Sequence, residues 1–182
     1  MSKLVIVGAG FAGFWSAISA VRQARACGAD DIIDVTLIAK DGYHTIRPRL
    51  YEAPSEDMRI PLARYCDPLG IRLLVGEVTA IEPEARRIKI AAASEPLVYD
   101  SLIVAAGSTL TQPDIPGLSY AFNADTYDAA MRLDRQVKRL QSTVAAGGGR
   151  ERVVVVGGGL TGLEVVTALC ERLTQSAERQ CA

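Results

Sequence analysis

The chain has 182 residues, enough for one domain and part of a second at about 100–200 residues per domain. Hydrophobic residues make up 49% and charged residues 23%, which are globular proportions and exclude a disordered or collagen-like chain. A net charge of −1 and 5% aromatic residues give no reason to expect a nucleic-acid partner. The four cysteines form no CxxC pair, so we expect neither a metal site nor a redox dithiol, and their scatter suits a reducing cytoplasm.

The N-terminal segment combines a short apolar run with a helical pattern. Leu4–Val7 ends at a glycine and is typical of a strand buried on both faces of a parallel sheet. Apolar residues then recur at steps of three and four, which predicts an amphipathic helix with Phe11, Phe14, Trp15, Ile18 and Val21 on one face. The uncharged stretch from Leu4 to Val21 leaves a signal peptide or membrane anchor as the alternative, but its three glycines would weaken an apolar helix. We therefore expect no transmembrane segment in this chain.

The middle of the chain reads as strands. Residues 34–39 look like the second strand of a βαβ unit, and 71–81 with 87–92 like an antiparallel pair. Residues 101–105 resemble another buried strand. Prolines at 113 and 116 then interrupt the pattern, and we place a boundary between domains 1–112 and 113–182 there.

The last third repeats the first pattern. A helix capped by Asp125 should end at Gly147–Gly149, and Val153–Val156 should form a buried strand. A helix should follow, with Leu163, Val166, either Leu169 or Cys170, and Leu173 on one face, and its pattern should fade after Leu173. The predicted fold is therefore α/β: a Rossmann-like parallel sheet with an added antiparallel strand pair, followed by the start of a second Rossmann-like domain.

Two glycine loops carry the chemistry. Both fit G-x-G-x-x-G between a predicted strand and a predicted helix, a context that favours dinucleotide binding over a plain turn. The first glycine permits a tight turn, the second admits a pyrophosphate, and the third allows close packing of helix on strand. The loops are Gly8-Ala9-Gly10-Phe11-Ala12-Gly13 and Gly157-Gly158-Gly159-Leu160-Thr161-Gly162.

The acidic residue that usually ends the second strand and binds a ribose is missing. Ala39 stands at that position, followed by Lys40 and Asp41. Asp41 lies two residues after Ala39, so in an extended chain its side chain points to the same side. It is one candidate for the ribose contact. The alternative is that Asp41-Gly42 forms only a turn.

The order of these motifs resembles flavoproteins with two dinucleotide-binding domains, and most closely the type II NADH dehydrogenases. The segment Val5–Gly13 is similar to that family's FAD-binding start, and Tyr43–Glu52 to the segment passing near the flavin ring. Gly76–Ile81 resembles the strand that holds the adenine end, and Tyr99–Ser108 the second FAD motif. The segment Val153–Glu164 is similar to the NAD(P)H motif. The resemblance covers nearly the whole chain.

The resemblance implies FAD and NAD(P)H as cofactors, with hydride passing from nicotinamide to flavin and electrons to a quinone or another small acceptor. Glu164 matches the glutamate near the nicotinamide and flavin and is the candidate catalytic residue. The implied cofactor-binding residues are Gly8, Gly10, Phe11, Ala12, Gly13, Ala39, Lys40, Arg47, Pro48, Val78, Ala106, Gly107, Gly157, Gly159, Leu160, Thr161 and Gly162. The lack of a CxxC motif disfavours the disulfide-reductase branch of the superfamily.

The resemblance also implies a partial length. Members of this class are about twice as long, so the chain looks like the N-terminal half of such an enzyme. A non-catalytic FAD-binding or interaction module, and a reductase of a small iron–sulfur carrier, are the alternatives. We expect self-association through the exposed apolar face of the last helix, and a cytoplasmic location or one at the inner membrane face.

His44, Arg47 and Arg49 each have a plainer interpretation. His44 is the only histidine, so packing or a place beside the flavin is favoured over metal binding. Arg47 and Arg49 are either solvated surface arginines or contacts to the FAD phosphates or ring.

Overall fold

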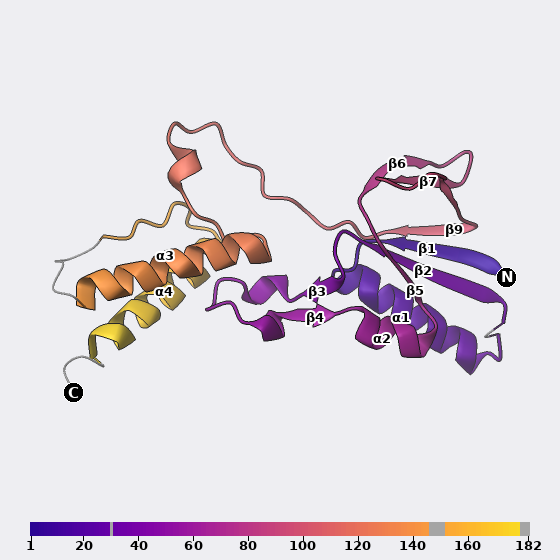
Figure 1. The fold of residues 1–182 in the computed structure, drawn as a ribbon, viewed down its shortest axis with the longest axis horizontal. Coiled ribbons are helices and arrows are strands. Elements are labelled where there is room, and N and C mark those ends of the chain that lie inside the picture. The colour runs from indigo at the N-terminus through magenta and orange to yellow at the C-terminus, as the bar shows by residue number, and fades with distance from the viewer. Residues whose placement is uncertain (30, 146–151, 179–182) are drawn as a thin grey trace. The chain divides into compact units, whose positions relative to one another are not determined.

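A computed structural model of the protein describes residues 1–29, 31–145 and 152–178 (Figure 1). They fold into two compact units. The first comprises residues 1–45 and 59–108, and the second comprises residues 46–58 with the described part of 109–182. The division into an FAD-binding domain 1–112 and an NAD(P)H-binding part 113–182 stays a prediction.

The first unit is built on a parallel sheet of four strands in the order β5-β2-β1-β9. These are β1 (Ser2–Val7), β2 (Ile33–Ala39), β5 (Arg72–Val75) and β9 (Ser101–Val104). Numbered along the chain within the sheet, the order is 3-2-1-4, that of a nucleotide-binding Rossmann half. Because the order reverses between β1 and β9, the ends of these two strands flank the crevice where such sheets bind ligands.

Both faces of the sheet are covered (Figure 1). The helices α1 (Phe11–Ala26) and α2 (Ala63–Leu69) cover one face, where Ile6 and Leu37 pack with Phe14 and Cys66. On the other face, an antiparallel sheet of β6 (Val78–Glu82), β7 (Arg87–Ile90) and β8 (Leu97–Val98) contributes Ile88 to a cluster with Val5, Val7 and Ile38. Each such fully buried aliphatic side chain stabilises the fold by about 1.5–3 kcal/mol.

The α/β class, the parallel sheet, the strands near 4–7 and 34–39 and the antiparallel pairing of residues 78–82 with 87–90 are confirmed, but three details in this unit differ from the prediction. Residues 71–81 are two strands, because the chain turns at Gly76 and β5 joins the parallel sheet. The strand at 101–105 is not buried: among the described residues β9 pairs with β1 alone, and Val104 is 60% exposed. Phe11 and Trp15 remain 47% and 55% exposed, because α1 packs against the sheet through Phe14 and Ala17 instead.

Several elements are too short for a repeating pattern of apolar residues and were not predicted. The strands β3 (Tyr43–Thr45) and β4 (Arg59–Pro61) form a small antiparallel pair in the first unit. Three 3₁₀ turns span Arg47–Arg49, Glu56–Met58 and Leu118–Tyr120. No helix within the described ranges is long and apolar enough to cross a bilayer, and Leu4–Val7 lies in a strand.

The second unit contains two adjacent helices, α3 (Tyr127–Ala145) and α4 (Leu160–Glu178) (Figure 1). The buried carboxylate of Asp134 joins them by pairing with Arg172 of α4, and it also binds Lys138 at 2.8 Å. Residues 46–58 belong to this unit because Leu50 and Met58 pack against Ala130.

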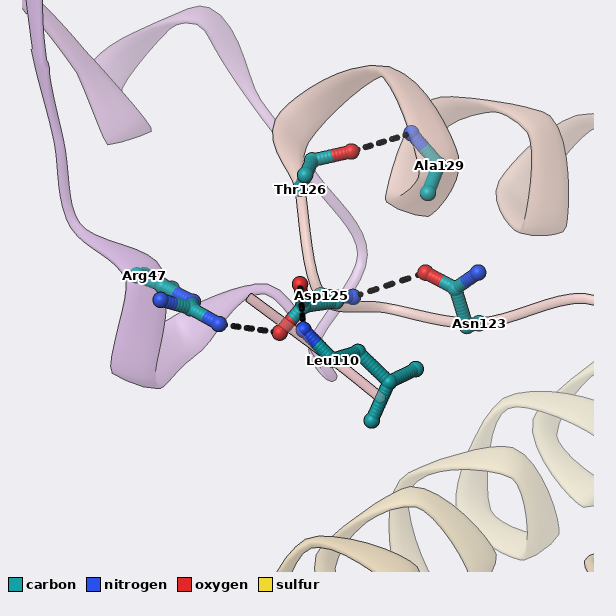
Figure 2. A network of polar contacts seen from close by, with 6 residues as sticks. All are labelled: Arg47, Leu110, Asn123, Asp125, Thr126 and Ala129. Carbon is teal, nitrogen blue, oxygen red and sulfur yellow. Dashed lines mark hydrogen bonds and ion pairs between the residues drawn. The ribbon is translucent and has the colours of Figure 1, made fainter. Parts of the chain in front are cut away.

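The helix predictions need two corrections. Thr126, not Asp125, caps α3: the Ala129 N–H donates to Thr126 Oγ1 at 3.3 Å (Figure 2). The last helix does not fade after Leu173 but continues to Glu178. The predicted stop at Gly147–Gly149 lies outside the described residues.

The predicted buried strand Val153–Val156 is also wrong. Residues 152–158 form neither helix nor strand, and Val154 and Val156 are 73% and 84% exposed. A strand needs a neighbour to take its backbone hydrogen bonds, and none lies beside this segment in the part of the chain that the structure describes. On α4, Leu163 and Val166 are exposed as expected, whereas Leu169 is buried.

Candidate nucleotide-binding site

The first glycine loop joins β1 to α1, and two of its glycines leave no room for a side chain. Gly8 has a φ of 102°, and a Cβ there would overlap the carbonyl oxygen of Ala105. A Cβ on Gly13 would overlap the carbonyl oxygen of Gly8. The loop is therefore closed against β9 and α1 by backbone contacts that only glycine permits.

Gly10 has the opposite environment. A Cβ there would meet nothing within 4 Å, so the packing of this chain does not itself require a glycine. Gly10 precedes α1, where no side chain caps the helix and no acidic residue occupies the first turn. The first N–H groups and the positive end of the helix dipole are thus free to bind an anion.

The ends of four parallel strands bring predicted site residues to one edge of the sheet. Three backbone hydrogen bonds of 2.8 Å join these strand ends. The Gly8 N–H donates to the Ile38 carbonyl, the Gly76 N–H to that of Ala39, and the Ala105 N–H to that of Val7. Gly8–Gly13, Ala39–Lys40 and Ala106–Gly107 therefore share the edge at the strand-order reversal. Val78 opens β6 two residues after Gly76 and pairs with Ile90.

The carboxylate nearest the end of β2, that of Asp41, already has two partners. Ala39 is 3% exposed within the core cluster beneath α1. The Asp41 carboxylate accepts hydrogen bonds from the Tyr43 N–H at 3.0 Å and from Arg59 at 2.9 Å, which is the geometry of a turn. Lys40 is largely exposed and lies 3.8 Å from a carboxylate oxygen of Glu77, a surface pair worth at most about 1 kcal/mol.

His44 lies directly beneath the first glycine loop. Its side chain is 4% exposed, and Nδ1 is 2.8 Å from the Ala9 carbonyl oxygen. The ring packs edge-on against Phe11, with centroids 4.8 Å apart, and tilted against Phe14 at 5.2 Å. No group of three or more candidate metal ligands occurs in residues 1–29, 31–145 or 152–178. Packing is what the structure shows for His44, and the bond to the loop is a contact that sequence reasoning missed because nothing in the pattern links residues 9 and 44.

Arg47 and Pro48 lie in a 3₁₀ turn of the second unit. Figure 2 shows the Arg47 guanidinium paired with the carboxylate of Asp125, which also accepts the Leu110 N–H at 3.3 Å. Arg49 forms a two-pronged bond with Glu52, and this hydrogen bond lowers the pKa of the Glu52 carboxyl. Arg47 and Arg49, both candidates for contact with FAD, thus pair with carboxylates of their own unit.

The second glycine loop repeats the local geometry of the first. Gly157 has a φ of 111°, and a Cβ on Gly162 would overlap the Gly157 carbonyl oxygen. The Leu163 N–H donates to Gly159 O at 3.1 Å, as the Phe14 N–H does to Gly10 O at 3.0 Å. Gly159 is open like Gly10, and Leu160, Thr161 and Glu164 are exposed around it at the start of α4.

Comparison with known proteins identifies the family. Residues 2–176 match the model of the pyridine nucleotide-disulphide oxidoreductase family. The chain belongs to this family. Within it, the chain is 38% identical over 178 residues to an NADH dehydrogenase-like protein of Mycobacterium tuberculosis, covering 95% of this chain and 43% of that protein.

Two further proteins similar to this chain show the same partial coverage. A type II NADH:quinone oxidoreductase of Staphylococcus haemolyticus is 28% identical over 95% of this chain and 44% of its own. The crystal structure of NADH:rubredoxin oxidoreductase from Clostridium acetobutylicum matches with a TM-score of 0.74 and 25% identity over 94% of this chain and 42% of that one. The chain therefore spans less than half the length of the curated relatives it matches.

The family implies FAD and a nicotinamide nucleotide, and the residues present fit the pyrophosphates of both. Each loop has a second glycine whose missing Cβ leaves open space, at Gly10 and Gly159. The helix that follows Gly10 presents uncapped N–H groups toward that space. The adenosine ribose is the exception, because Ala39 has no carboxylate and that of Asp41 already accepts the Tyr43 N–H and Arg59.

Proposed function

We propose that this chain provides the FAD-binding and NAD(P)H-binding parts of a flavin-dependent NAD(P)H dehydrogenase that delivers electrons to a quinone. When bound, FAD supplies the chemistry, accepting hydride from the reduced nicotinamide and passing electrons to the acceptor. The single observation that carries the proposal is the first glycine loop, which is closed at Gly8 and Gly13 and open at Gly10 beside the switch point of the sheet.

The chain's own residues bind and orient the nucleotides. The backbone at Gly10, Phe11 and Ala12 holds the FAD pyrophosphate, since a glycine and the uncapped helix end allow close approach. Ala106 and Gly107 form the opposite wall of the crevice, and the Val78 backbone lies toward the adenine end. The loop Gly157–Gly162 holds the pyrophosphate of NAD(P)H in the way that the first loop holds that of FAD. Glu164 faces the nicotinamide.

Quinone is the acceptor we favour because the relatives named above include a type II NADH:quinone oxidoreductase. The similarity to NADH:rubredoxin oxidoreductase supports a second candidate, a reductase of a small iron-containing protein. Both candidates use the same two nucleotide sites and differ only in the final electron acceptor.

The proposal is tested with the purified full chain. Reconstitution with FAD should give a flavin absorbance band near ~450 nm that survives desalting, and anaerobic NADH should bleach it. Reoxidation by a water-soluble quinone, compared with reoxidation by oxidised rubredoxin, distinguishes the two acceptors. A chain that retains no flavin would overturn the proposal for the first loop.

Bleaching also needs a matched control. Gly159→Val should leave the flavin band in place and remove its bleaching by NADH, because the added side chain fills the open space of the second loop. Dithionite should still bleach the flavin of this variant. Bleaching of both proteins by NADH at equal rates would mean that the nicotinamide binds elsewhere.

A further inference from the structure

His44 contacts the first glycine loop at one defined atom. A carbonyl oxygen only accepts hydrogen bonds, so in the 2.8 Å contact with Ala9 the imidazole Nδ1 carries the proton and donates it. This fixes the tautomer of the neutral ring, with the proton on Nδ1 and a lone pair on Nε2.

The imidazole ring is also held in place. Phe11 and Phe14 of α1 pack against it, and β3 fixes its backbone through the pairing of His44 with Ile60. With 4% of the residue exposed, water does not replace the bond to Ala9. The donor therefore sits at a fixed point beneath the loop.

The bond has a consequence on the other side of the peptide. The amide that links Ala9 to Gly10 is planar and trans, so its C=O and its N–H point in opposite directions. The C=O points at the buried imidazole. The Gly10 N–H consequently points away from the core, on the side where Gly10 is exposed and a Cβ would meet no atom.

We infer that His44 is a positioning residue for the phosphate site: by holding the Ala9 carbonyl it aims the Gly10 N–H at the pyrophosphate of the bound dinucleotide. This rests on the proposed FAD binding for its ligand, but the orientation of the peptide belongs to the nucleotide-free chain. Without the bond this peptide is free to rotate, since the glycine on its C-terminal side tolerates most backbone angles.

The first test needs no ligand. Nitrogen-15 spectra of the full chain without nucleotide should show the His44 imidazole protonated on Nδ1, with a single sharp Gly10 amide signal. In His44→Leu the Gly10 signal should broaden or split as the peptide becomes mobile. A His44 ring that carries its proton on Nε2, or an unchanged Gly10 signal in the variant, would overturn the inference.

The second test measures FAD affinity by titration of three variants. The side-chain nitrogen of asparagine occupies the place of Nδ1, whereas that of glutamine lies nearer the place of Nε2. We expect His44→Leu and His44→Gln to weaken FAD binding about tenfold, and His44→Asn to stay within about threefold of the wild type. Urea unfolding of each variant serves as the stability control, and the two amide variants remain comparable if His44→Leu fails to fold.

The outcomes separate the two claims. Equal FAD affinity in all three variants and the wild type would overturn the role of His44 while leaving FAD binding intact. A wild-type chain that binds no FAD, yet shows the Nδ1–H tautomer and the mobile Gly10 peptide in His44→Leu, would overturn the proposed function and leave the positioning role standing.

Discussion

The two glycine loops share a sequence pattern and a local shape, yet their surroundings differ. In both, the first glycine has a positive φ and its carbonyl lies against the third. Among the described residues, a Cβ at Gly8 would overlap Ala105 at the end of β9, whereas one at Gly157 would meet nothing within 4 Å. The glycine pattern thus determines a turn within six residues, and a neighbouring strand determines whether that turn becomes one wall of a crevice.

The largest expected effect tests this difference directly. Gly13→Ala should destabilise the first unit by about 3 kcal/mol, because the methyl group meets the Gly8 carbonyl and the Ala105 side chain in a packed layer. Gly162→Ala should cost about 1 kcal/mol, because residues 152–158 are exposed and free to shift. Urea unfolding followed by circular dichroism measures both.

Gly10→Ala is the matched control for that pair, since the site is open and the cost should stay below about 1 kcal/mol. Equal destabilisation by Gly13→Ala and Gly162→Ala would mean that the sheet behind the first loop adds no constraint.

A second prediction concerns what stabilises the second unit in place of a sheet. Asp134→Asn removes the buried charge that joins α3 to α4 through Arg172, so we expect a loss of about 2–4 kcal/mol. Lys138→Met, which removes only an exposed partner of the same carboxylate, should cost less than about 1 kcal/mol. Thermal unfolding of both variants should rank them in this order, and the reverse ranking would contradict the assignment.

The smallest effect concerns the ribose. Asp41→Asn should leave FAD affinity within about twofold, because the carboxylate already serves the Tyr43 N–H and Arg59. The asparagine oxygen still accepts the Tyr43 N–H, so the turn is retained. Isothermal titration with FAD measures the effect, and a tenfold loss would restore Asp41 as the ribose partner.

Local patterns in the sequence predicted the elements that have a period. Leu4–Val7, the helix from Phe11 and the roles of Gly8 and Gly13 follow from apolar spacing and from what glycine alone permits. Apolar runs do not tell which neighbour a strand will have. Among the described residues, the same kind of run became a central strand at 4–7, an edge strand at 101–104 and, at 153–156, a segment that is neither helix nor strand.

The parts of the site that were missed depend on contacts between distant residues. The bond from His44 to Ala9 spans 35 positions, and the pair between Arg47 and Asp125 spans 78. Neither contact produces a repeating pattern in the sequence. Asp125 looked like a helix cap because it precedes an amphipathic helix, but Thr126 stands one residue nearer and takes that role.

The central claim is that each loop holds its own dinucleotide. It is tested most directly by blocking one loop at a time and measuring the binding of both nucleotides. FAD and NADH are titrated separately into the full chain, Gly10→Val and Gly159→Val. We expect Gly10→Val to weaken FAD at least ~100-fold and leave NADH unchanged, and Gly159→Val to do the reverse, because each valine fills the open space of one loop. Loss of both ligands in either variant, or of neither in both, would contradict the assignment of one dinucleotide to each loop.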